Sequence, residues 1–245
     1  KHRIGRPSRQ LGRNFVTHPN VKVLAVYPHD VRGWKGVSQW GQVREFHDEG
    51  IIFAENMVPS GAMAAALPAH GRAVWREMQR YNNMVLSGIL VEDTSTGVIR
   101  RGPFDMALPF YSITQRDLET FLRAVRTLGK MHFEMGAERL ILPFANLHEV
   151  RSIDELRRVN TVNIKIRDVE LFTPHLMGTA RMGATARSSV VDLQGQVWDL
   201  PGCYIADASI FPTAIGVNPQ VTIMALALKM GADLAERIHR ARKGS

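Results

Sequence analysis

The sequence predicts an α+β fold, in which helices pack against an antiparallel sheet. Segments in which apolar and polar residues alternate lie mainly in the first half of the chain and mix irregularly with helical segments. A long segment after Thr114 carries apolar residues at helical spacing. No internal repeat is visible. With 45% hydrophobic residues, the 245-residue chain can bury a substantial core.

Strands are expected where β-branched and apolar residues alternate. Residues 20–31 read NVKVLAVYPHDV, and a second short strand is expected at residues 51–53. Two β-rich stretches within residues 82–102 flank the turn-forming cluster 93–97, which predicts a β-hairpin. Further short strands are expected at residues 139–143, 161–172, 190–192 and 203–207.

Capping residues and apolar spacing locate the helices. The clearest helix of the first half begins after Thr114, whose hydroxyl can cap it together with Asp117, and it ends at Gly136. Its apolar residues recur every three or four positions, as one buried helix face requires. Shorter helices are expected in residues 59–81, broken at Pro68 and Gly71, and in residues 151–160.

The final helix, expected over residues 220–239, is preceded by residues that favour a helix N-terminus. Asn218 is a favourable N-cap residue, and Pro219 is pre-shaped for the first helical position. The helix body is apolar nearly all round, which predicts that it is buried. The N–H groups and partial positive charge at a buried N-terminus would suit an anionic ligand. An ordinary well-capped core helix explains the same residues.

The net charge of +8 does not by itself predict a nucleic-acid-binding surface. Residues 1–13 and 237–243 hold nine of the 31 Lys and Arg residues and no acidic residue, so the rest of the chain is nearly neutral. A nucleic-acid-binding face would more often interleave basic and aromatic side chains. Solvated basic tails are therefore the favoured interpretation, and a nucleic-acid-binding module is the less favoured one.

The cysteine count and hydropathy narrow the class of protein further. The single cysteine, Cys203, excludes an internal disulfide and a multi-cysteine metal site, and no metal ion is predicted. It fits a reducing compartment, so a cytoplasmic location is expected. No apolar run reaches the roughly 18 residues of a membrane span, and the basic N-terminal segment lacks the apolar centre of a signal peptide.

Two side chains in the second half could take part in chemistry. His175 follows a proline and lies close to Gly178, and a neutral histidine is suited to accepting a proton near pH 7. A structural histidine bonded to a loop carbonyl explains the same residue. Asp207 ends an expected strand, where a carboxylate could bind a ribitol or ribose hydroxyl, by analogy with dinucleotide sites.

In order and at this spacing, these segments resemble a known family. The stretch from HLMGTARMG at residue 175 to GADLAERI at residue 238 closely resembles the C-terminal signature of the glucose–methanol–choline (GMC) oxidoreductases. These flavoproteins oxidise alcohols with bound FAD. LGRNFVTHPN, residues 11–20, resembles the family segment that leads into the substrate domain. Residues 33–68 are similar to the branch that contains the long-chain alcohol oxidases.

The resemblance implies roles for matching positions. His175 would be the active-site histidine over the flavin. Asn218 would be the second catalytic residue, which is His in some branches and Asn in the cholesterol-oxidase-like branch. The helix start would lie against the pyrimidine edge of the flavin. The implied FAD contacts are Asp207, Ala208, Asn218, Pro219, Gln220 and Thr222.

The resemblance also implies a division of the chain. Residues 1–171 would form mainly the substrate-binding domain, and residues 172–245 the C-terminal portion of a Rossmann-like FAD-binding domain. The G-x-G-x-x-G turn with which the family binds the ADP half of FAD does not occur in these 245 residues. We therefore expect an N-terminal FAD-binding portion, in the same gene product or on a separate chain, and an inactive isolated chain.

The expected activity is FAD-dependent oxidation of the CH–OH group of an alcohol. A long-chain or other apolar alcohol is the expected substrate, because residues 57–68 and 104–111 could line an apolar pocket. A role in the hydrophobic core explains most of the same residues. The alternative is a non-enzymatic module that retains the fold and does not bind FAD independently. The presence of both His175 and Asn218 favours the enzyme.

Overall fold

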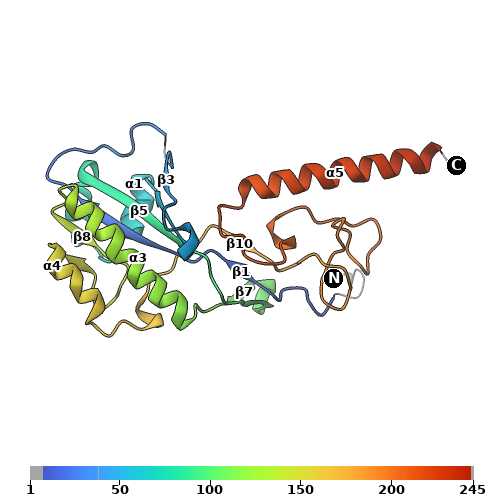
Figure 1. Cartoon of the computed structure of the whole chain (residues 1–245), viewed down its shortest axis with the longest axis horizontal. Helices are drawn as coiled ribbons and strands as arrows, with labels where there is room; N and C mark the ends of the chain where they lie inside the picture. The colour runs from blue at the N-terminus through green and yellow to red at the C-terminus, as the bar shows by residue number, and fades with distance from the viewer. Residues whose placement is uncertain (1–7, 38, 244–245) are drawn as a thin grey trace. The chain divides into compact units, whose positions relative to one another are not determined.

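The computed structural model describes residues 8–37 and 39–243 (Figure 1), and they fall into two compact units. We call residues 19–92 and 113–173 the sheet unit. Residues 8–18, 93–112 and 174–243 are the described part of the other unit, which we call the terminal unit because it contains both ends of the described chain.

The sheet unit is built on one six-stranded antiparallel sheet. The strand order is β3-β4-β5-β2-β8-β9, and the longest ladder pairs β2 with β5 from Asn20↔Leu90 to Val26↔Met84. This confirms the predicted α+β class. The strands are β2 (Asn20–Val26), β3 (Gln42–Val43), β4 (Ile51–Glu55), β5 (Met84–Val91), β8 (Arg139–Ile141) and β9 (Glu149–Val150).

One face of the sheet is covered by α3 (Gln115–Glu134), which contacts β2, β4 and β5 (Figure 1). The helix begins with the predicted capping box, in which the Thr114 hydroxyl accepts from the Asp117 N–H and the Asp117 carboxylate accepts from the Thr114 N–H. It ends before Gly136, whose φ of +88° lets the chain turn away. The apolar stripe of α3 is buried through Leu118, Phe121, Val125 and Leu128.

The other face carries two short helices, α1 (Ser60–Ala66) and α2 (Arg72–Met78). Met63 and Leu67 pack with Leu24, Leu86 and Ile141 in one buried cluster. The break between the helices confirms the expected interruption between Pro68 and Gly71. The remaining short helices in the described residues are α4 (Ile153–Leu156) and the 3₁₀ helices η1 (His47–Glu49), η2 (Tyr81–Asn83), η3 (Pro103–Asp105), η4 (Arg157–Asn160), η5 (Ile166–Asp168) and η6 (Ala208–Ile210).

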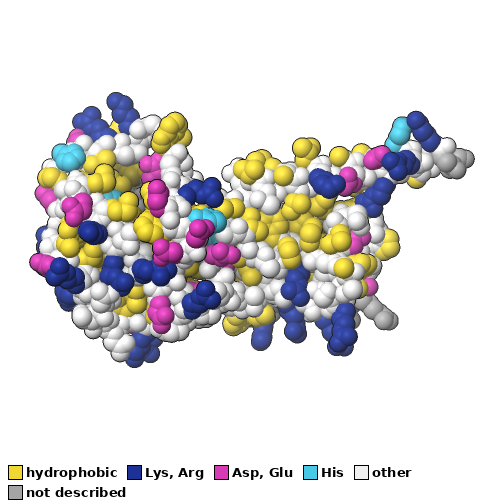
Figure 2. Space-filling model, viewed as in Figure 1, with side chains coloured by type: hydrophobic (Ala, Val, Ile, Leu, Met, Phe, Trp, Pro, Cys, Tyr) yellow, Lys and Arg dark blue, Asp and Glu magenta, His cyan; other side chains and the backbone are white. Residues whose placement is uncertain are grey.

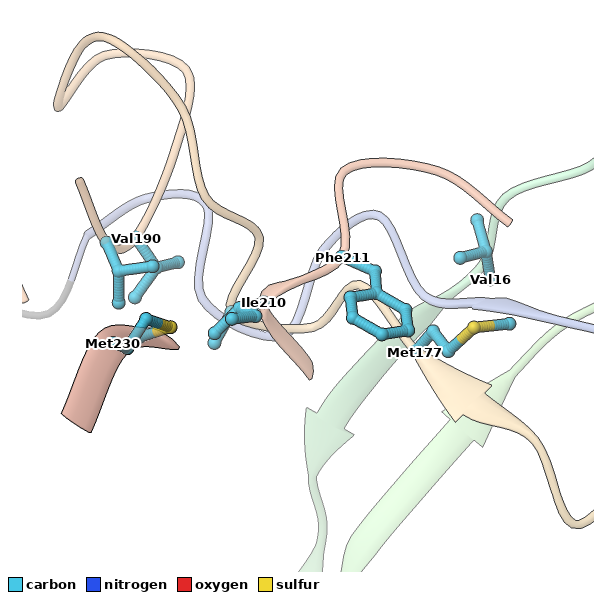
Figure 3. Close-up of a cluster of buried hydrophobic side chains, with 8 residues drawn as sticks. Val16, Met177, Val190, Ile210, Phe211 and Met230 are labelled. Carbon is cyan, nitrogen blue, oxygen red and sulfur yellow. The ribbon is translucent and has the colours of Figure 1, made fainter. Parts of the chain in front are cut away.

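The terminal unit contains little regular sheet. Strand β1 (Val16–Thr17) pairs antiparallel with β10 (Leu176–Met177), and β6 (Val98–Arg101) forms a hairpin with β7 (Ala107–Phe110). The last described element is the long helix α5 (Gln220–Lys243). Figure 3 shows the core of this unit, in which side chains from β1, β10, η6, α5 and the intervening loops meet; its labelled residues are Val16, Met177, Val190, Ile210, Phe211 and Met230.

The expected hairpin over residues 82–102 is wrong. β5 pairs with β2 and β4, whereas β6 pairs with β7. The turn-forming residues 93–97 are instead where the chain passes from the sheet unit to the terminal unit. β5 is buried almost throughout and has partner strands on both sides, so it takes a central place in the sheet.

The strands expected at residues 161–172, 190–192 and 203–207 do not form. Residues 161–172 contain η5 and isolated bridges such as Asn20↔Phe172. The other two segments make isolated bridges, for example Val191↔Val197 and Gln196↔Tyr204. Because a strand requires a continuous neighbour to hydrogen-bond with, an alternating sequence without such a neighbour stays irregular.

The prediction that the final helix is buried is also wrong for the described chain. Met230 is the one α5 side chain described as buried. One side of the helix joins the core through Ile223, Leu226 and Met230. The other side exposes three large apolar side chains, Val221, Met224 and Leu228, which are 72%, 55% and 77% exposed. Figure 2 shows hydrophobic side chains at the surface along α5.

A buried histidine ties α3 to the sheet. His132 is 6% exposed and lies between two hydroxyl groups, with Nδ1 2.9 Å from the Tyr27 Oη and Nε2 3.0 Å from the Ser87 Oγ. Burial lowers the pKa of His132 from 6.5 to about 4, because the interior disfavours the charged ring. The network is therefore formed by the neutral imidazole at pH 7.

We expect His132 to make the protein less stable in acid. The pKa of His132 is lower in the folded than in the unfolded protein, so protonation favours unfolding. The stability that the neutral ring provides is fully present above pH 6.5 and is lost as the pH falls towards about 4. We expect the free energy of unfolding, measured by urea titration, to fall by up to about 3 kcal/mol from this group. His132→Gln should flatten that pH dependence, whereas His70→Gln, at an exposed position, should not. If the free energy of unfolding depended on pH in the same way in both variants, His132 would not be the cause of the loss of stability in acid.

Candidate active site

The pairing of β1 with β10 brings two histidines together in the terminal unit. Thr17 pairs with Leu176, so His18, which follows β1, lies opposite His175, which precedes β10. Their Nδ1 atoms are 3.3 Å apart, and the rings meet edge to face with centroids 5.3 Å apart and planes at 81°. His18 is not among the residues that the sequence alone singled out. Its position in FVTHPN, directly after a short apolar stretch, becomes informative only when β1 and β10 are known to pair.

His18 also connects His175 to the loop before α5. It is fully buried, with 0% of its surface exposed, and its Nε2 accepts a hydrogen bond of 3.1 Å from the backbone N–H of Gly216. Gly216 has a φ of +66°, a conformation that favours glycine, and it lies two residues before Asn218. The hydrogen bonds of His18 therefore link the predicted catalytic histidine to the segment that carries the predicted catalytic asparagine.

Both histidines are held neutral. Burial, and then the nearby charge of a protonated His175, lower the pKa of His18 from 6.5 to about 4. Burial also lowers the pKa of His175. At pH 7 each ring therefore has one protonated and one unprotonated nitrogen, which is the state that a proton acceptor requires.

Asp207 and Ala208 lie beside the loop that follows His175. Backbone hydrogen bonds join Gly178 N–H to the Ala208 carbonyl at 3.2 Å and Ala180 N–H to the Ser209 carbonyl at 2.8 Å. The exposed Asp207 caps η6, with Oδ1 accepting from the Ser209 N–H at 2.8 Å. The segment after His175 and the segment at Asp207 are thus adjacent, although residues 203–207 do not form the expected strand.

Gly178 is required for this arrangement. Its φ is +83°, and a Cβ atom at this position would lie 2.2 Å from the carbonyl oxygen of Asn14. Any larger residue would push apart the loop after His175 and the segment that leads into β1. The glycine therefore keeps His175 and His18 in register.

The N-terminus of α5 lies in a more exposed setting than the sequence predicted. Asn218 is exposed and Pro219 is buried, and the Ile223 N–H bonds the Pro219 carbonyl at 2.8 Å. The first turn of α5, which includes Gln220 and Thr222, contains no acidic side chain.

The terminal unit thus offers a neutral imidazole, a carboxamide, an accessible carboxylate and a helix N-terminus free of acidic residues. These groups fit a polar, anionic cofactor such as FAD, because a helix start favours negative charge and a carboxylate can accept hydrogen bonds from ribityl hydroxyls. Within the described residues, no group of three or more His, Cys, Asp or Glu side chains is placed to hold a metal ion. None of the described helices is long and apolar enough to cross a membrane.

Comparison with known proteins identifies the family. Residues 95–227, more than half of the chain, match the family model described as GMC oxidoreductase. A long-chain-alcohol oxidase of Arabidopsis thaliana is 39% identical over 263 residues, an alignment covering 98% of this chain and 34% of that protein. An uncharacterised GMC-type oxidoreductase of Mycobacterium tuberculosis is 29% identical over 94% of this chain and 36% of its own length.

Solved structures share the fold. Pyridoxine 4-oxidase from Mesorbium loti superposes with a TM-score of 0.64 and 20% identity, over 94% of this chain and 44% of that one. A formate oxidase of Aspergillus oryzae, studied for the modification of its FAD, superposes with a TM-score of 0.65 and 13% identity, over 96% and 48%. The chain spans about a third of the length of the curated relatives it matches. It belongs to the GMC oxidoreductase family.

Proposed function

We propose that this chain is the C-terminal part of an FAD-dependent oxidoreductase that acts on the CH–OH group of an alcohol. The observation that carries the proposal is the neutral His175, held by a buried second histidine in the same unit as Asn218 and the start of α5. FAD, when bound, would accept the hydride from the alcohol carbon. The residues of this chain would bind the alcohol oxygen and move its proton.

His175 would take the hydroxyl proton, because a neutral imidazole is matched to proton transfer near pH 7. Asn218 would hold the alcohol oxygen with its amide N–H as negative charge develops there. Proton transfer is thus assigned to His175, whose pKa is lowered by burial, and binding of the alcohol oxygen to the exposed carboxamide of Asn218. Both roles are proposals that rest on family membership and on the chemistry of the side chains.

The cofactor contacts are proposed on the same basis. Asp207 would bind ribityl hydroxyls, since its side chain is exposed and caps a short 3₁₀ turn with one oxygen. Ala208 would let the diphosphate approach the backbone. The first residues of α5 would place backbone N–H groups against the pyrimidine edge of the flavin, where negative charge collects on reduction; these residues are Asn218, Pro219, Gln220 and Thr222.

The complete enzyme would include a further FAD-binding portion N-terminal to this chain. The relatives are about three times as long as the stretch that aligns with it. A helix that is apolar on both sides is normally covered on both sides, and α5 exposes Val221, Met224 and Leu228. We propose that the N-terminal portion covers this face. Residues 172–245 would then complete the FAD-binding domain, and most of residues 1–171 would bind substrate.

A long-chain or other apolar alcohol is the proposed substrate. The identity with a long-chain-alcohol oxidase supports this class. In the sheet unit, a small cavity between the sheet and the end of α1 is lined mainly by apolar side chains, including Leu24, Ala66, Pro68 and Leu86. Of residues 57–68, Ala66 and Pro68 line this cavity, whereas Met63 and Leu67 belong to the core of the sheet unit. Of residues 104–111, Phe104 and Phe110 are 97% and 52% exposed.

Flavin content tests whether the chain needs another portion. We expect the isolated 245-residue chain, purified with added FAD, to show little bound flavin absorbance, because it lacks a G-x-G-x-x-G turn to hold the ADP half. The full-length protein should bind one FAD per polypeptide. Stoichiometric flavin on the isolated chain would contradict the proposed architecture, and a colourless full-length protein would contradict the proposed cofactor.

A further inference from the structure

His18 is a buried titratable group that the proposed reaction does not use. It lies beside the proposed proton acceptor, it is fully buried, and each of its ring nitrogens has a recorded neighbour in the terminal unit. Nε2 faces the Gly216 N–H at 3.1 Å, and Nδ1 faces Nδ1 of His175 at 3.3 Å. While both contacts are intact, a buried ring of this kind keeps one tautomer.

The Gly216 amide determines which nitrogen of His18 carries the proton. A backbone N–H can only donate, so Nε2 of His18 must accept and must be unprotonated. His18 is neutral at pH 7, because burial lowers its pKa to about 4. Its single proton therefore lies on Nδ1, the nitrogen that faces His175.

The same reasoning extends to His175. With an N–H of His18 directed at it, Nδ1 of His175 must be the unprotonated, accepting nitrogen. If both Nδ1 atoms carried protons, two N–H groups would face each other without an acceptor. A neutral His175 then carries its own proton on Nε2, the ring nitrogen that does not face His18.

We propose, on the basis of the proposed function, that His18 is a positioning residue that selects the tautomer of His175. While the Gly216 bond is intact, His175 presents Nε2–H and donates a hydrogen bond to an alcohol oxygen. To accept the hydroxyl proton, Nε2 of His175 must first be unprotonated. In the exchange that achieves this, Nδ1 of His18 passes its proton to Nδ1 of His175, Nε2 of His175 releases its proton to water, and Nε2 of His18 takes up a proton from water, which requires the Gly216 amide to move away. One proton leaves the pair and one enters it, so each ring still carries one.

Nitrogen NMR of the full 245-residue chain, labelled with ¹⁵N-histidine, tests the assignment directly, because protonated and unprotonated ring nitrogens have well-separated shifts. At pH 7 we expect His18 to be protonated on Nδ1 and His175 on Nε2. The His18 signals are identified as those that disappear in His18→Asn. A His18 ring protonated on Nε2 would overturn the proposal.

Two substitutions separate tautomer selection from simple packing. His18→Phe keeps the ring shape and removes the donor, so the His175 nitrogen signals should move towards the average of two exchanging tautomers. His18→Asn places an amide N–H near the former Nδ1 and should hold His175 in the wild-type tautomer. His70→Phe, at an exposed position, is the control and should leave the His175 signals unchanged. Unchanged His175 signals in His18→Phe would also overturn the proposal.

These readouts need neither FAD nor an alcohol. If the tautomers are as assigned but the full-length protein does not oxidise alcohols, the proposed function fails and the role of His18 in selecting the tautomer remains. If alcohols are oxidised but His18 is protonated on Nε2, the tautomer assignment fails and the proposed function remains. The two claims can therefore be contradicted independently.

Discussion

In the full-length protein, His175→Ala should slow the reduction of bound flavin by alcohol by about 10²- to 10⁴-fold, the usual contribution of a general base. The reason is that alanine cannot take the hydroxyl proton as hydride leaves the carbon. FAD binding should persist, because the proposed cofactor contacts lie at Asp207, Ala208 and the start of α5. The measurement is anaerobic stopped-flow absorbance at the flavin band.

His70→Ala is the matched control for this variant, since it removes a histidine that is exposed on the sheet unit. It should reduce its flavin at the wild-type rate. Wild-type reduction kinetics in His175→Ala would remove His175 from the mechanism. Loss of FAD from His175→Ala would instead make this histidine part of the cofactor site.

The second large effect is expected at the apolar face of α5. Leu228→Glu should be nearly neutral in the isolated chain, because Leu228 is 77% exposed and surface substitutions usually change stability by about 0.5 kcal/mol or less. In the full-length protein the same carboxylate would be buried against the N-terminal portion without a partner. That burial costs several kcal/mol, on the order of the penalty for an unpaired buried charge.

Thermal denaturation of both forms measures this difference. Leu228→Glu should lower the midpoint of the full-length protein strongly and reduce its flavin content, while the isolated chain keeps its midpoint. Leu193→Glu is the control, because Leu193 is 60% exposed in the same unit and lies outside α5. If Leu228→Glu and Leu193→Glu had equal effects on the full-length protein, the proposed contact would be excluded.

Local sequence signals predicted the elements that local interactions determine. The capping box at Thr114 and Asp117 and the glycine at 136 delimit α3 because the groups that interact are a few residues apart. The strand β2 was also predicted from its local pattern, but it forms because partner strands from distant parts of the sequence lie on both sides of it. The stretch at 203–207 has a similar pattern but pairs only at an isolated bridge, which no local pattern reveals.

Only some residues of the candidate site could be singled out from the sequence, because contacts between residues far apart in the chain leave no local signal. His175, Asp207 and Asn218 could be singled out from their neighbours in the sequence and from the family resemblance. His18 could not, because its importance depends on a contact with a residue 157 positions away and on the Gly216 amide 198 positions away. The exposure of α5 was missed because an all-round apolar helix indicates burial in the complete protein, whichever portion supplies the cover.

Reduction of the flavin by an alcohol is the direct test of the proposed activity. The full-length protein, loaded with FAD and kept free of oxygen, would be mixed with a long-chain primary alcohol while the flavin absorbance is followed. We expect the absorbance of the flavin band to fall as the flavin is reduced, and one molecule of the corresponding aldehyde to form for each flavin reduced. A flavin that stays oxidised with long-chain, short-chain and sterol alcohols alike would contradict the assignment of this chain to an alcohol oxidoreductase.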